Sequence, residues 1–408
     1  DDVIKGNIIA SDDVIASCKR FKDDLKRDDL EIRTTQPDAA ISIIEGMFVH
    51  RQGETLEGVP LMGKPLKLQP WQIFIIYNLI GFYYKGTDER RYKEAFIFVA
   101  RKNGKTTFIA ALSFALALLE RKSGSKIYIT SASLKQASQS FDEIVYTLKH
   151  RKMIDQFTLH DNRQEHMLQR EWSSGGSIYI EAVAANPDAQ DSFNCNIAIA
   201  DEIHAFKKAA QYNRFKEAMK AYTNKLMIGI TTAGDNMNSF CYRRLEYARK
   251  VLNKTVKDDS LFCFLCAADQ DENGDVDYTD PIQHEKANPS YGVTIRPEDI
   301  MHDALQAQND AQQRKDFLSR SLNVYTTAMR AYFNIDEFRC SDQQYEWSLE
   351  ELAKLPVTWY GGADLSKMHD LTAAALFGHY DKENVDIVIT HAFFPVVNAA
   401  KKADEDGI

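Results

Sequence analysis

The sequence Glu94-Ala-Phe-Ile-Phe-Val-Ala-Arg-Lys-Asn-Gly-Lys-Thr-Thr107 combines an apolar run with a basic, glycine-containing turn. The run from Ala95 to Val99 is aromatic and β-branched, which predicts a buried strand, and residues 108–119 have the composition and length of a helix. A strand, a turn carrying Gly104-Lys105-Thr106 and a helix that starts there form an arrangement that cradles phosphate groups.

The residue types in this turn suit a triphosphate. Backbone N–H groups and the positive end of the helix would face the anion, Lys105 would reach the β- and γ-phosphates, and the Thr106 hydroxyl would ligate Mg²⁺. The usual pattern has a glycine five residues before Gly104, where this chain has Val99. From this turn alone, a basic loop that caps a buried helix stays open as an alternative.

A second segment is an apolar strand that ends in two adjacent carboxylates. In Asn196-Ile-Ala-Ile-Ala-Asp-Glu-Ile-His204, Asp201 would complete the Mg²⁺ shell, and Glu202 would orient or deprotonate the attacking water. Such a pair can also be a solvent-exposed strand end. Its occurrence downstream of the Gly-Lys-Thr turn predicts an ATPase.

Two weaker signals accompany these segments. Thr231 and Thr232 end a predicted strand over residues 226–231, and their hydroxyls would sense the γ-phosphate and couple its loss to the rest of the chain. Helix-capping threonines are the alternative. Gln72 lies at the start of an apolar helix that opens with Pro70, and its amide could pair with the edge of adenine.

The middle of the chain alternates predicted strands with helical patterns. The strands are expected near residues 95–99, 126–133, 177–183, 196–200 and 226–231. This alternation predicts an α/β fold with a largely parallel sheet, covered on both faces and binding ligands at the carboxyl ends of its strands. A helical run is expected over residues 297–322.

The sequence also predicts a change of domain near residue 351. A strand over residues 357–366 carries Asp364, and two further strands follow at 370–378 and 385–390. An aspartate on a strand with antiparallel neighbours is how a two-metal phosphodiester nuclease begins, because the carboxylate bridges metal ions that activate water and stabilise the leaving oxygen.

Composition limits the class of protein. The 408 residues include 50 basic and 59 acidic side chains, a net charge of −9, which neither indicates nor excludes a local groove for nucleic acid. No bilayer-length apolar run and no leader are visible, so we expect a soluble, cytosolic protein. Six scattered cysteines suit a reducing compartment, and Cys263-Phe-Leu-Cys266 predicts a buried strand rather than half a zinc site.

The order of these motifs resembles the large terminase subunit of tailed bacteriophages and prophages, the motor that packs DNA into proheads. The matching segments lie between about residues 65 and 380, and they are, in order, Leu68–Gln72, Val99–Thr106, Ile197–Glu202, Thr231–Gly234, and Gly361–Ser366 with Asp370. The resemblance accounts for the missing glycine, because Arg101 is similar to an arginine that in this family touches the phosphates from within the same subunit.

The resemblance implies a P-loop ATPase of the RecA/ASCE type, a small lid subdomain and the start of an RNase H-like nuclease domain. The expected divisions are a helical segment over 1–64, the ATPase domain over 65–240, the lid or connector over 241–350 and the nuclease over 351–408. ATP and Mg²⁺ are the implied ligands, with Mg²⁺ or Mn²⁺ held by Asp364 and Asp370. The residues implied to contact ATP are Gln72, Arg101, Lys102, Asn103, Gly104, Lys105, Thr106 and Thr107, among which Arg101 and Lys105 join Glu202 as catalytic residues.

The implied partners are double-stranded DNA, a portal protein, a small terminase subunit and further copies of this chain. The copies would form a ring, commonly of five, with a monomer as the alternative in isolation, in the cytoplasm of a bacterial host and without a membrane. A neighbouring subunit would offer an arginine finger. No arginine lies directly before the Asp-Glu strand, which leaves Arg163, Arg170 and Arg214 as candidates.

Two other classes of protein are considered. A DEAD-like helicase also has Gln, Gly-Lys-Thr and Asp-Glu-x-His motifs, but it needs a second RecA-like domain, and residues 236–408 show no second alternating run of that length. A non-enzymatic DNA-binding scaffold with a decayed ATPase predicts loss of Lys105 or Glu202, and both are present.

Overall fold

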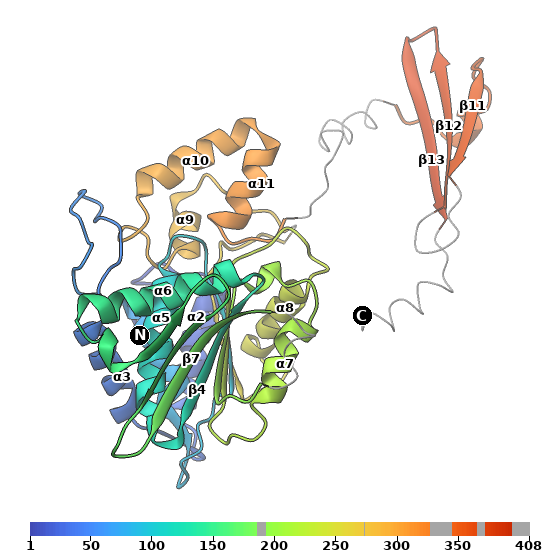
Figure 1. Cartoon of the computed structure of the whole chain (residues 1–408). Helices are drawn as coiled ribbons and strands as arrows, with labels where there is room; N and C mark the ends of the chain where they lie inside the picture. The colour runs from blue at the N-terminus through green and yellow to red at the C-terminus, as the bar shows by residue number, and fades with distance from the viewer. Residues whose placement is uncertain (186–192, 273, 327–344, 365–371, 394–408) are drawn as a thin grey trace. The chain divides into compact units, whose positions relative to one another are not determined.

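The computed structural model describes residues 1–408 except 186–192, 273, 327–344, 365–371 and 394–408 (Figure 1). It divides into two compact units, Asp1–Ala328 and Met329–Ile408. The helices of the first unit are α1 (Asp2–Lys5), α2 (Asp12–Asp24), α3 (Thr35–Met47), α4 (Pro70–Gly81), α5 (Lys105–Glu120), α6 (Leu134–His150), α7 (Ala210–Ala218), α8 (Phe240–Leu252), α9 (Pro281–Ala287), α10 (Pro297–Asn309) and α11 (Ala311–Arg320).

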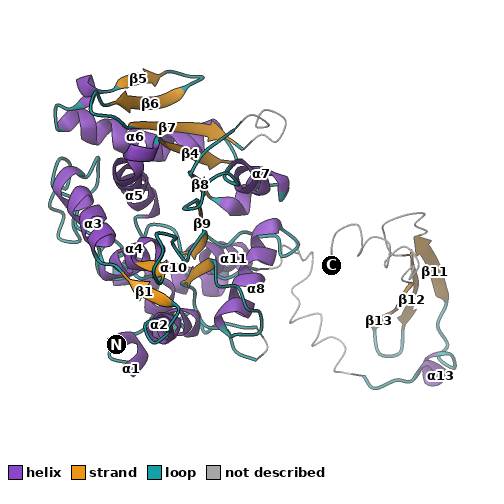
Figure 2. Ribbon diagram, turned by 90° about the horizontal axis from the view of Figure 1, so that it is seen from below, coloured by secondary structure: helices purple, strands orange, loops and turns teal. Residues whose placement is uncertain are grey.

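The first unit is built on an eight-stranded sheet in the order β10-β3-β9-β8-β4-β7-β6-β5 (Figure 2). Pairing is parallel from β10 through β7, and β6 and β5 continue the sheet as antiparallel strands. The sheet is therefore mainly parallel, as predicted. Its strands are β3 (Glu94–Phe98), β4 (Ser125–Ser131), β5 (Thr158–Asp161), β6 (His166–Glu171), β7 (Ser177–Ala184), β8 (Ile197–Asp201), β9 (Leu226–Thr231) and β10 (Leu261–Leu265).

Helices cover both faces of this sheet because its strands are apolar on both sides. Alternate residues of one strand belong to different cores: Ile97 packs with α4, α5 and α6, whereas Phe96 and Phe98 pack with α7 and α8. Figure 1 shows α5 and α6 on one side of the sheet and α7 and α8 on the other. The carboxyl ends of β3, β8 and β9 thus lie next to one another at one edge of a buried layer.

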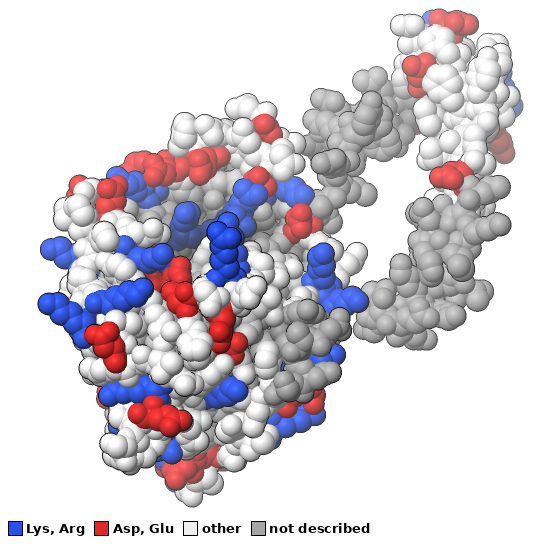
Figure 3. Space-filling view, in the orientation of Figure 1, with Lys and Arg blue, Asp and Glu red and all other residues white. Residues whose placement is uncertain are grey.

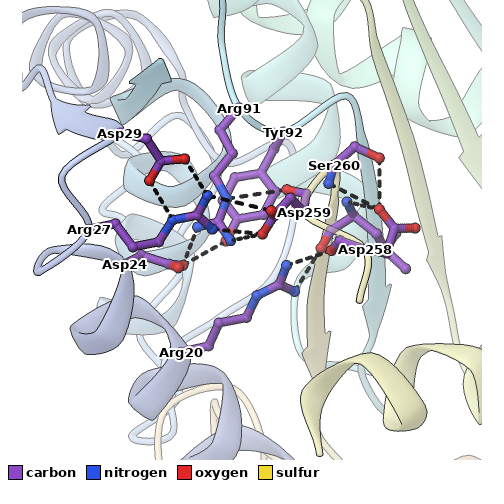
Figure 4. A network of polar contacts seen from close by, with 10 residues as sticks. Arg20, Asp24, Arg27, Asp29, Arg91, Tyr92, Asp258, Asp259 and Ser260 are labelled. Carbon is purple, nitrogen blue, oxygen red and sulfur yellow. Dashed lines mark hydrogen bonds and ion pairs between the residues drawn. The ribbon is translucent and has the colours of Figure 1, made fainter. Parts of the chain in front are cut away.

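A network of charged residues fastens the N-terminal segment to the edge strand β10 (Figure 4). Arg91, which is 1% exposed, forms an ion pair with Asp24 of α2. Arg27 contacts Asp259 at 2.7 Å, and Arg20 donates to the carbonyls of Asp258 and Leu261, both at 2.8 Å. A two-stranded sheet of β1 (Leu30–Ile32) and β2 (Phe82–Tyr84) adds a second attachment. The predicted divisions at residues 64 and 240 stay a prediction.

The connector, which we define as residues 266–326, contains α9, α10 and α11 around a small core of its own. The helical run predicted over residues 297–322 is present, but it is divided into two helices that meet at Asp310. The backbone of Asp310 is extended (φ −140°, ψ 114°), and its carboxylate accepts from the N–H groups of Gln312 and Gln313. An aspartate in this position starts a new helix and interrupts the old one.

The second unit contains an antiparallel three-stranded sheet in the order β11-β12-β13, preceded by a short helix. The three predicted strands are present. The elements are α13 (Leu349–Leu352), β11 (Trp359–Asp364), β12 (Thr372–Tyr380) and β13 (Val385–Phe393).

Two expectations from composition concern buried segments. Cys263 lies on β10 and Cys266 directly follows it, and both are buried, so the buried-strand prediction is confirmed. Burial raises the pKa of the Cys263 thiol to about 12. Within the ranges that the structure covers, none of the helices has the length and apolar character needed to cross a bilayer.

Candidate active site

The turn between β3 and α5 reverses the chain through two residues with left-handed backbone conformation. Lys102 has φ 66° and Gly104 has φ 77°. No atom lies within 4 Å of the place that a Cβ on Gly104 would take, so the glycine is favoured by its φ value rather than by lack of space. Successive residues of such alternating conformation point their N–H groups to one side, which makes a concave anion site at the start of α5.

Lys105, the first residue of α5, folds back over this turn. Its Nζ atom donates to the carbonyl oxygens of Val99 at 2.9 Å and of Ala100 at 3.0 Å, and the side chain is buried. Burial lowers the pKa of Lys105, while the charges of Glu202 and Asp201 raise it. The amine is therefore held inside the site, close to the carboxylates of Asp201 and Glu202.

Asp201 is the last residue of β8, and Glu202 follows it in the left-handed region with φ 54°. A non-glycine residue in that region costs about 1–3 kcal/mol, and such strain is found mostly at functional sites. Burial and the adjacent Glu202 raise the pKa of Asp201 to about 7. Burial also acts to raise the pKa of Glu202, but a hydrogen bond with His204 and the positive charge of Lys105 lower it to about 2.

His204 connects Glu202 with the end of β9. Its Nδ1 atom lies 3.0 Å from the Glu202 carboxylate, and its backbone N–H donates to the Thr231 hydroxyl at 3.0 Å. The Thr232 hydroxyl donates to Glu202 at 3.4 Å. The two threonines therefore contact the Asp-Glu segment directly. Sequence reasoning did not assign a role to His204, although its place directly after Asp-Glu-Ile was a usable signal.

A pocket of about 650 Å³ opens over these groups. It is lined by Arg101, Lys102, Gly104, Lys105, Thr106, Thr107, Asp201 and Glu202, all predicted, and by His50, Arg51, Gln52, Gly53, Gln136, Gln139, Glu143 and His204, which sequence reasoning missed. Apart from His204, which follows β8, the missed residues come from the loop after α3 and from α6, which the sequence does not place beside the turn. The tertiary structure therefore brings two of the predicted segments, the turn and the Asp-Glu pair, to one pocket.

Two predicted ATP contacts lie elsewhere. The side-chain oxygen of Gln72 accepts from the Gln69 N–H at 2.9 Å, which caps α4, and Gln72 does not line the pocket. Asn103 is fully buried, and its amide bonds to the turn and to the connector rather than facing the pocket. Their predicted contacts with ATP stay predictions.

The three candidate finger arginines lie outside the pocket lining. Arg163 is exposed in the turn between β5 and β6. Arg170 on β6 is engaged, with its guanidinium over Trp172 at 4.6 Å and hydrogen-bonded to Gln156 at 2.6 Å. Arg214 is half-buried on α7. Which of the three acts as a finger stays a prediction, and Arg163 is the most exposed of them.

The predicted nuclease residues belong to the second unit. Asp364 is the exposed last residue of β11 and pairs with Ala373 of β12. Asp370 lies outside the described residues. The described part of this unit is an antiparallel sheet, not the alternating α/β structure of the second RecA-like domain that a helicase requires.

The oxygen donors of the pocket fit a hard divalent cation. Asp201 is buried and the adjacent Glu202 is half-buried, and the pKa of about 7 at Asp201 reflects burial and repulsion by Glu202 that a dication would relieve. The Thr106 hydroxyl lines the same pocket. Carboxylate and hydroxyl oxygens are the ligand types that Mg²⁺ prefers.

A mainly parallel α/β sheet with this turn, lysine and carboxylate pair defines the class of P-loop nucleotide-binding proteins. Residues 70–250 match the family described as terminase large subunit, ATPase domain, and residues 255–407 match terminase large subunit, endonuclease domain. The chain belongs to the terminase large subunit family. The family and the fold class that the motif order implied are confirmed.

Two relatives and one solved structure are similar to this chain. The protein YmfN of Escherichia coli K12 is 32% identical over 186 residues, which are 45% of this chain and 39% of YmfN. The terminase large subunit of Enterobacteria phage HK97 is 25% identical over 358 residues, 85% of this chain and 63% of that protein. This chain therefore spans less than two thirds of each. The crystal structure of the HK97 large terminase shares the fold, with a TM-score of 0.58, 21% identity and coverage of 92% of this chain and 71% of that one.

Proposed function

We propose that this chain hydrolyses ATP to drive double-stranded DNA into a viral prohead, and that its second unit belongs to a metal-dependent endonuclease that cuts concatemeric DNA. One observation carries the ATPase part: Lys105, Asp201 and Glu202 converge on a single pocket at the carboxyl ends of β3 and β8. The two matched domain families support the pairing of an ATPase with a nuclease.

The roles in hydrolysis follow from position and charge. The N–H groups of the turn and the amine of Lys105 bind the phosphates, and Arg101 at the rim adds a second positive charge. Glu202, whose pKa is lowered, stays ionised at neutral pH and accepts a hydrogen bond from the attacking water. Thr231 and Thr232 contact Glu202 and His204, which gives them the coupling role.

Thr106 and Asp201 are the residues that would hold Mg²⁺ with the nucleotide. The ion supplies charge neutralisation at the phosphates when it is bound. Asp364 would serve the nuclease in the same way, with Mg²⁺ or Mn²⁺ and with Asp370 as a second ligand. Its exposed position on a strand end leaves it open to a phosphodiester.

The proposed partners are DNA, a portal protein, a small terminase subunit and further copies of this chain in a ring, in the host cytoplasm. Figure 3 shows acidic and basic side chains mixed over the face in view, so DNA contact by this protein would use local basic groups rather than a uniformly basic face. A ring requires head-to-tail contacts, in which Arg163 would act on the ATP of a neighbour.

Steady-state ATP hydrolysis tests the proposal. The parent chain and Glu202→Gln are compared with Mg²⁺ at low salt, with and without double-stranded DNA, together with nucleotide binding by each. We expect the parent to turn over ATP and Glu202→Gln to bind it without turnover. Equal hydrolysis by the two proteins would overturn the role of Glu202, and a parent that neither binds nor hydrolyses ATP would overturn the assignment of the pocket.

A further inference from the structure

Asn103 is a fully buried polar residue in the middle of the phosphate-binding turn, and its side chain faces away from the pocket. The amide nitrogen lies 3.2 Å from the carbonyl oxygen of Ala100 and 3.1 Å from that of Arg101. These hydrogen bonds point the carbonyls of Ala100 and Arg101 toward the Asn103 side chain. Because the N–H of a trans peptide points opposite to its carbonyl, the bond to the Arg101 carbonyl directs the Lys102 N–H away from Asn103, and the amide of Asn103 thus holds this part of the turn in one backbone conformation.

The same amide is bonded to the connector at both of its ends. Its nitrogen donates to the side-chain oxygen of Asn288 at 2.8 Å, and its oxygen accepts from the backbone N–H of Ser290 at 3.0 Å. Asn288 and Ser290 are themselves buried, at 1% and 0% exposed. A buried amide with partners on all sides permits little rotation, so the turn and the connector are held in one register.

Asn288 and Ser290 also form hydrogen bonds with other segments of the chain. The Asn288 amide nitrogen donates to the carbonyls of His284 and Ser321, both at 2.9 Å. The Ser290 hydroxyl accepts from the indole N–H of Trp71 at 3.2 Å. The start of α4, the turn, α9 and the end of α11 therefore meet at this pair of residues.

The connector touches the turn at two further points and the β9 end at one. Thr294 donates its hydroxyl to the Lys102 carbonyl at 2.8 Å, and the Arg320 carbonyl accepts from the Arg101 N–H at 3.1 Å. The side-chain oxygen of Asn323 accepts from the Ala233 N–H at 2.7 Å. The connector thus contacts both the phosphate-binding turn and the segment with the coupling role.

We propose that Asn288, Ser290 and Thr294 form a clasp that acts through Asn103 to pre-shape the phosphate-binding turn, and that makes the connector respond to nucleotide in the pocket. This inference rests on the proposed ATPase function. Asn103 is then a positioning residue whose side chain does not touch the nucleotide. Because the clasp sets the turn before the phosphates arrive, its loss weakens ATP binding more than it slows the chemical step.

Kinetics of variants test the first half of the proposal. We expect Asn288→Ala and Asn103→Ala each to raise KM for ATP about tenfold, because a buried partner loses its hydrogen bonds, with kcat changed less than about threefold. The double variant should be no worse than the poorer single one, since both break one linkage. Asn309→Ala, an exposed asparagine of the same connector, should match the parent. Loss of kcat with unchanged KM would overturn the clasp.

Thr294→Val tests the clasp independently if the variants of the buried residues fold poorly. Thr294 is exposed and valine has nearly its shape, so the variant should have the melting temperature of the parent. It removes one bond to the turn, and we expect KM for ATP to rise about threefold. A melting temperature and a KM that both equal those of the parent would remove Thr294 from the clasp.

Amide hydrogen exchange with MgATPγS tests the second half. We expect nucleotide to protect residues 284–294 and 320–323 in the parent chain, and this protection to be absent in Asn288→Ala at ATPγS concentrations that saturate both proteins. If the clasp has only a structural role, Asn288→Ala should show the same protection as the parent. That result would overturn the proposal that the connector responds to nucleotide. An inactive parent that binds no nucleotide would instead refute the ATPase function on which the clasp depends.

Discussion

The Nδ1 atom of His204 lies 3.0 Å from the carboxylate of Glu202, and the backbone N–H of the same histidine donates to Thr231. The residue expected to orient water is therefore held by a side chain that is itself bonded to the end of β9. This contact fixes a carboxylate whose backbone is in a strained left-handed conformation.

Replacement of His204 should slow hydrolysis without weakening ATP binding. His204→Ala removes a hydrogen bond to an ionised group, which is worth about 10- to 100-fold, and we expect kcat to fall by about that factor while KM changes little. His302→Ala, on the exposed side of α10, is the control and should match the parent. A raised KM with unchanged kcat would show that His204 supports binding instead.

Replacement of Lys105 should abolish tight nucleotide binding while the chain stays folded. Burial lowers the pKa of Lys105, so the charged amine carries a desolvation cost in the folded chain that its removal relieves, and Lys105→Ala should keep a melting temperature near that of the parent. Affinity for ATP should fall by about 10- to 100-fold, the range for a hydrogen bond to a charged group. Isothermal titration measures both proteins, with Lys122→Ala as the exposed control. Retained affinity would place the phosphates elsewhere.

The Arg91–Asp24 ion pair should be important for stability. Both side chains are buried, at 1% and 5% exposed, so removal of one partner leaves a buried charge. Arg91→Ala should lower the free energy of unfolding by about 3–5 kcal/mol, measured by urea denaturation. Lys254→Ala breaks the exposed pair with Asp23 and should cost less than about 1 kcal/mol. Similar losses in the two variants would mean that the N-terminal segment is not fastened by this network.

Glu143 should make stability depend on pH. Burial raises its pKa above the usual value of 4.5, so folding favours the protonated carboxyl. The loss of folding stability caused by burying this carboxyl is absent below its unfolded-state pKa and grows as the pH rises through its folded-state pKa. Glu143→Gln should therefore gain stability relative to the parent as the pH rises above 4.5, measured by denaturation at each pH, with Glu298→Gln as the exposed control. A gain at low pH instead would reverse the assigned sign.

Local patterns were sufficient for much of the sheet. The apolar run before Gly104 forms β3, and the run before Asp201 forms β8. A buried parallel strand is apolar on both faces, so it can be recognised from its own residues without knowledge of the strands that pair with it. The antiparallel strands β5 and β6 were not predicted, since they are partly polar and become a continuation of the sheet only through pairing with β7. Likewise, Asp310 divides a helical pattern through a cap that composition does not reveal.

For the candidate site, the sequence by itself determined the chemistry and the tertiary structure decided the partners. The residue types and order of Gly104-Lys105-Thr106 and Asp201-Glu202 indicate their ligand. Phosphate is bound by backbone N–H groups and an amine, and Mg²⁺ is bound by hydroxyl and carboxylate oxygens. Whether an amide faces ATP or the protein depends on segments far away in the chain. The Asn103 amide donates to Asn288, which lies 185 residues later in the chain. The Gln72 side chain instead accepts from the Gln69 N–H and caps its own helix. Hydrogen-bond direction is set by the nearest buried partner, and only folding determines which residue that is.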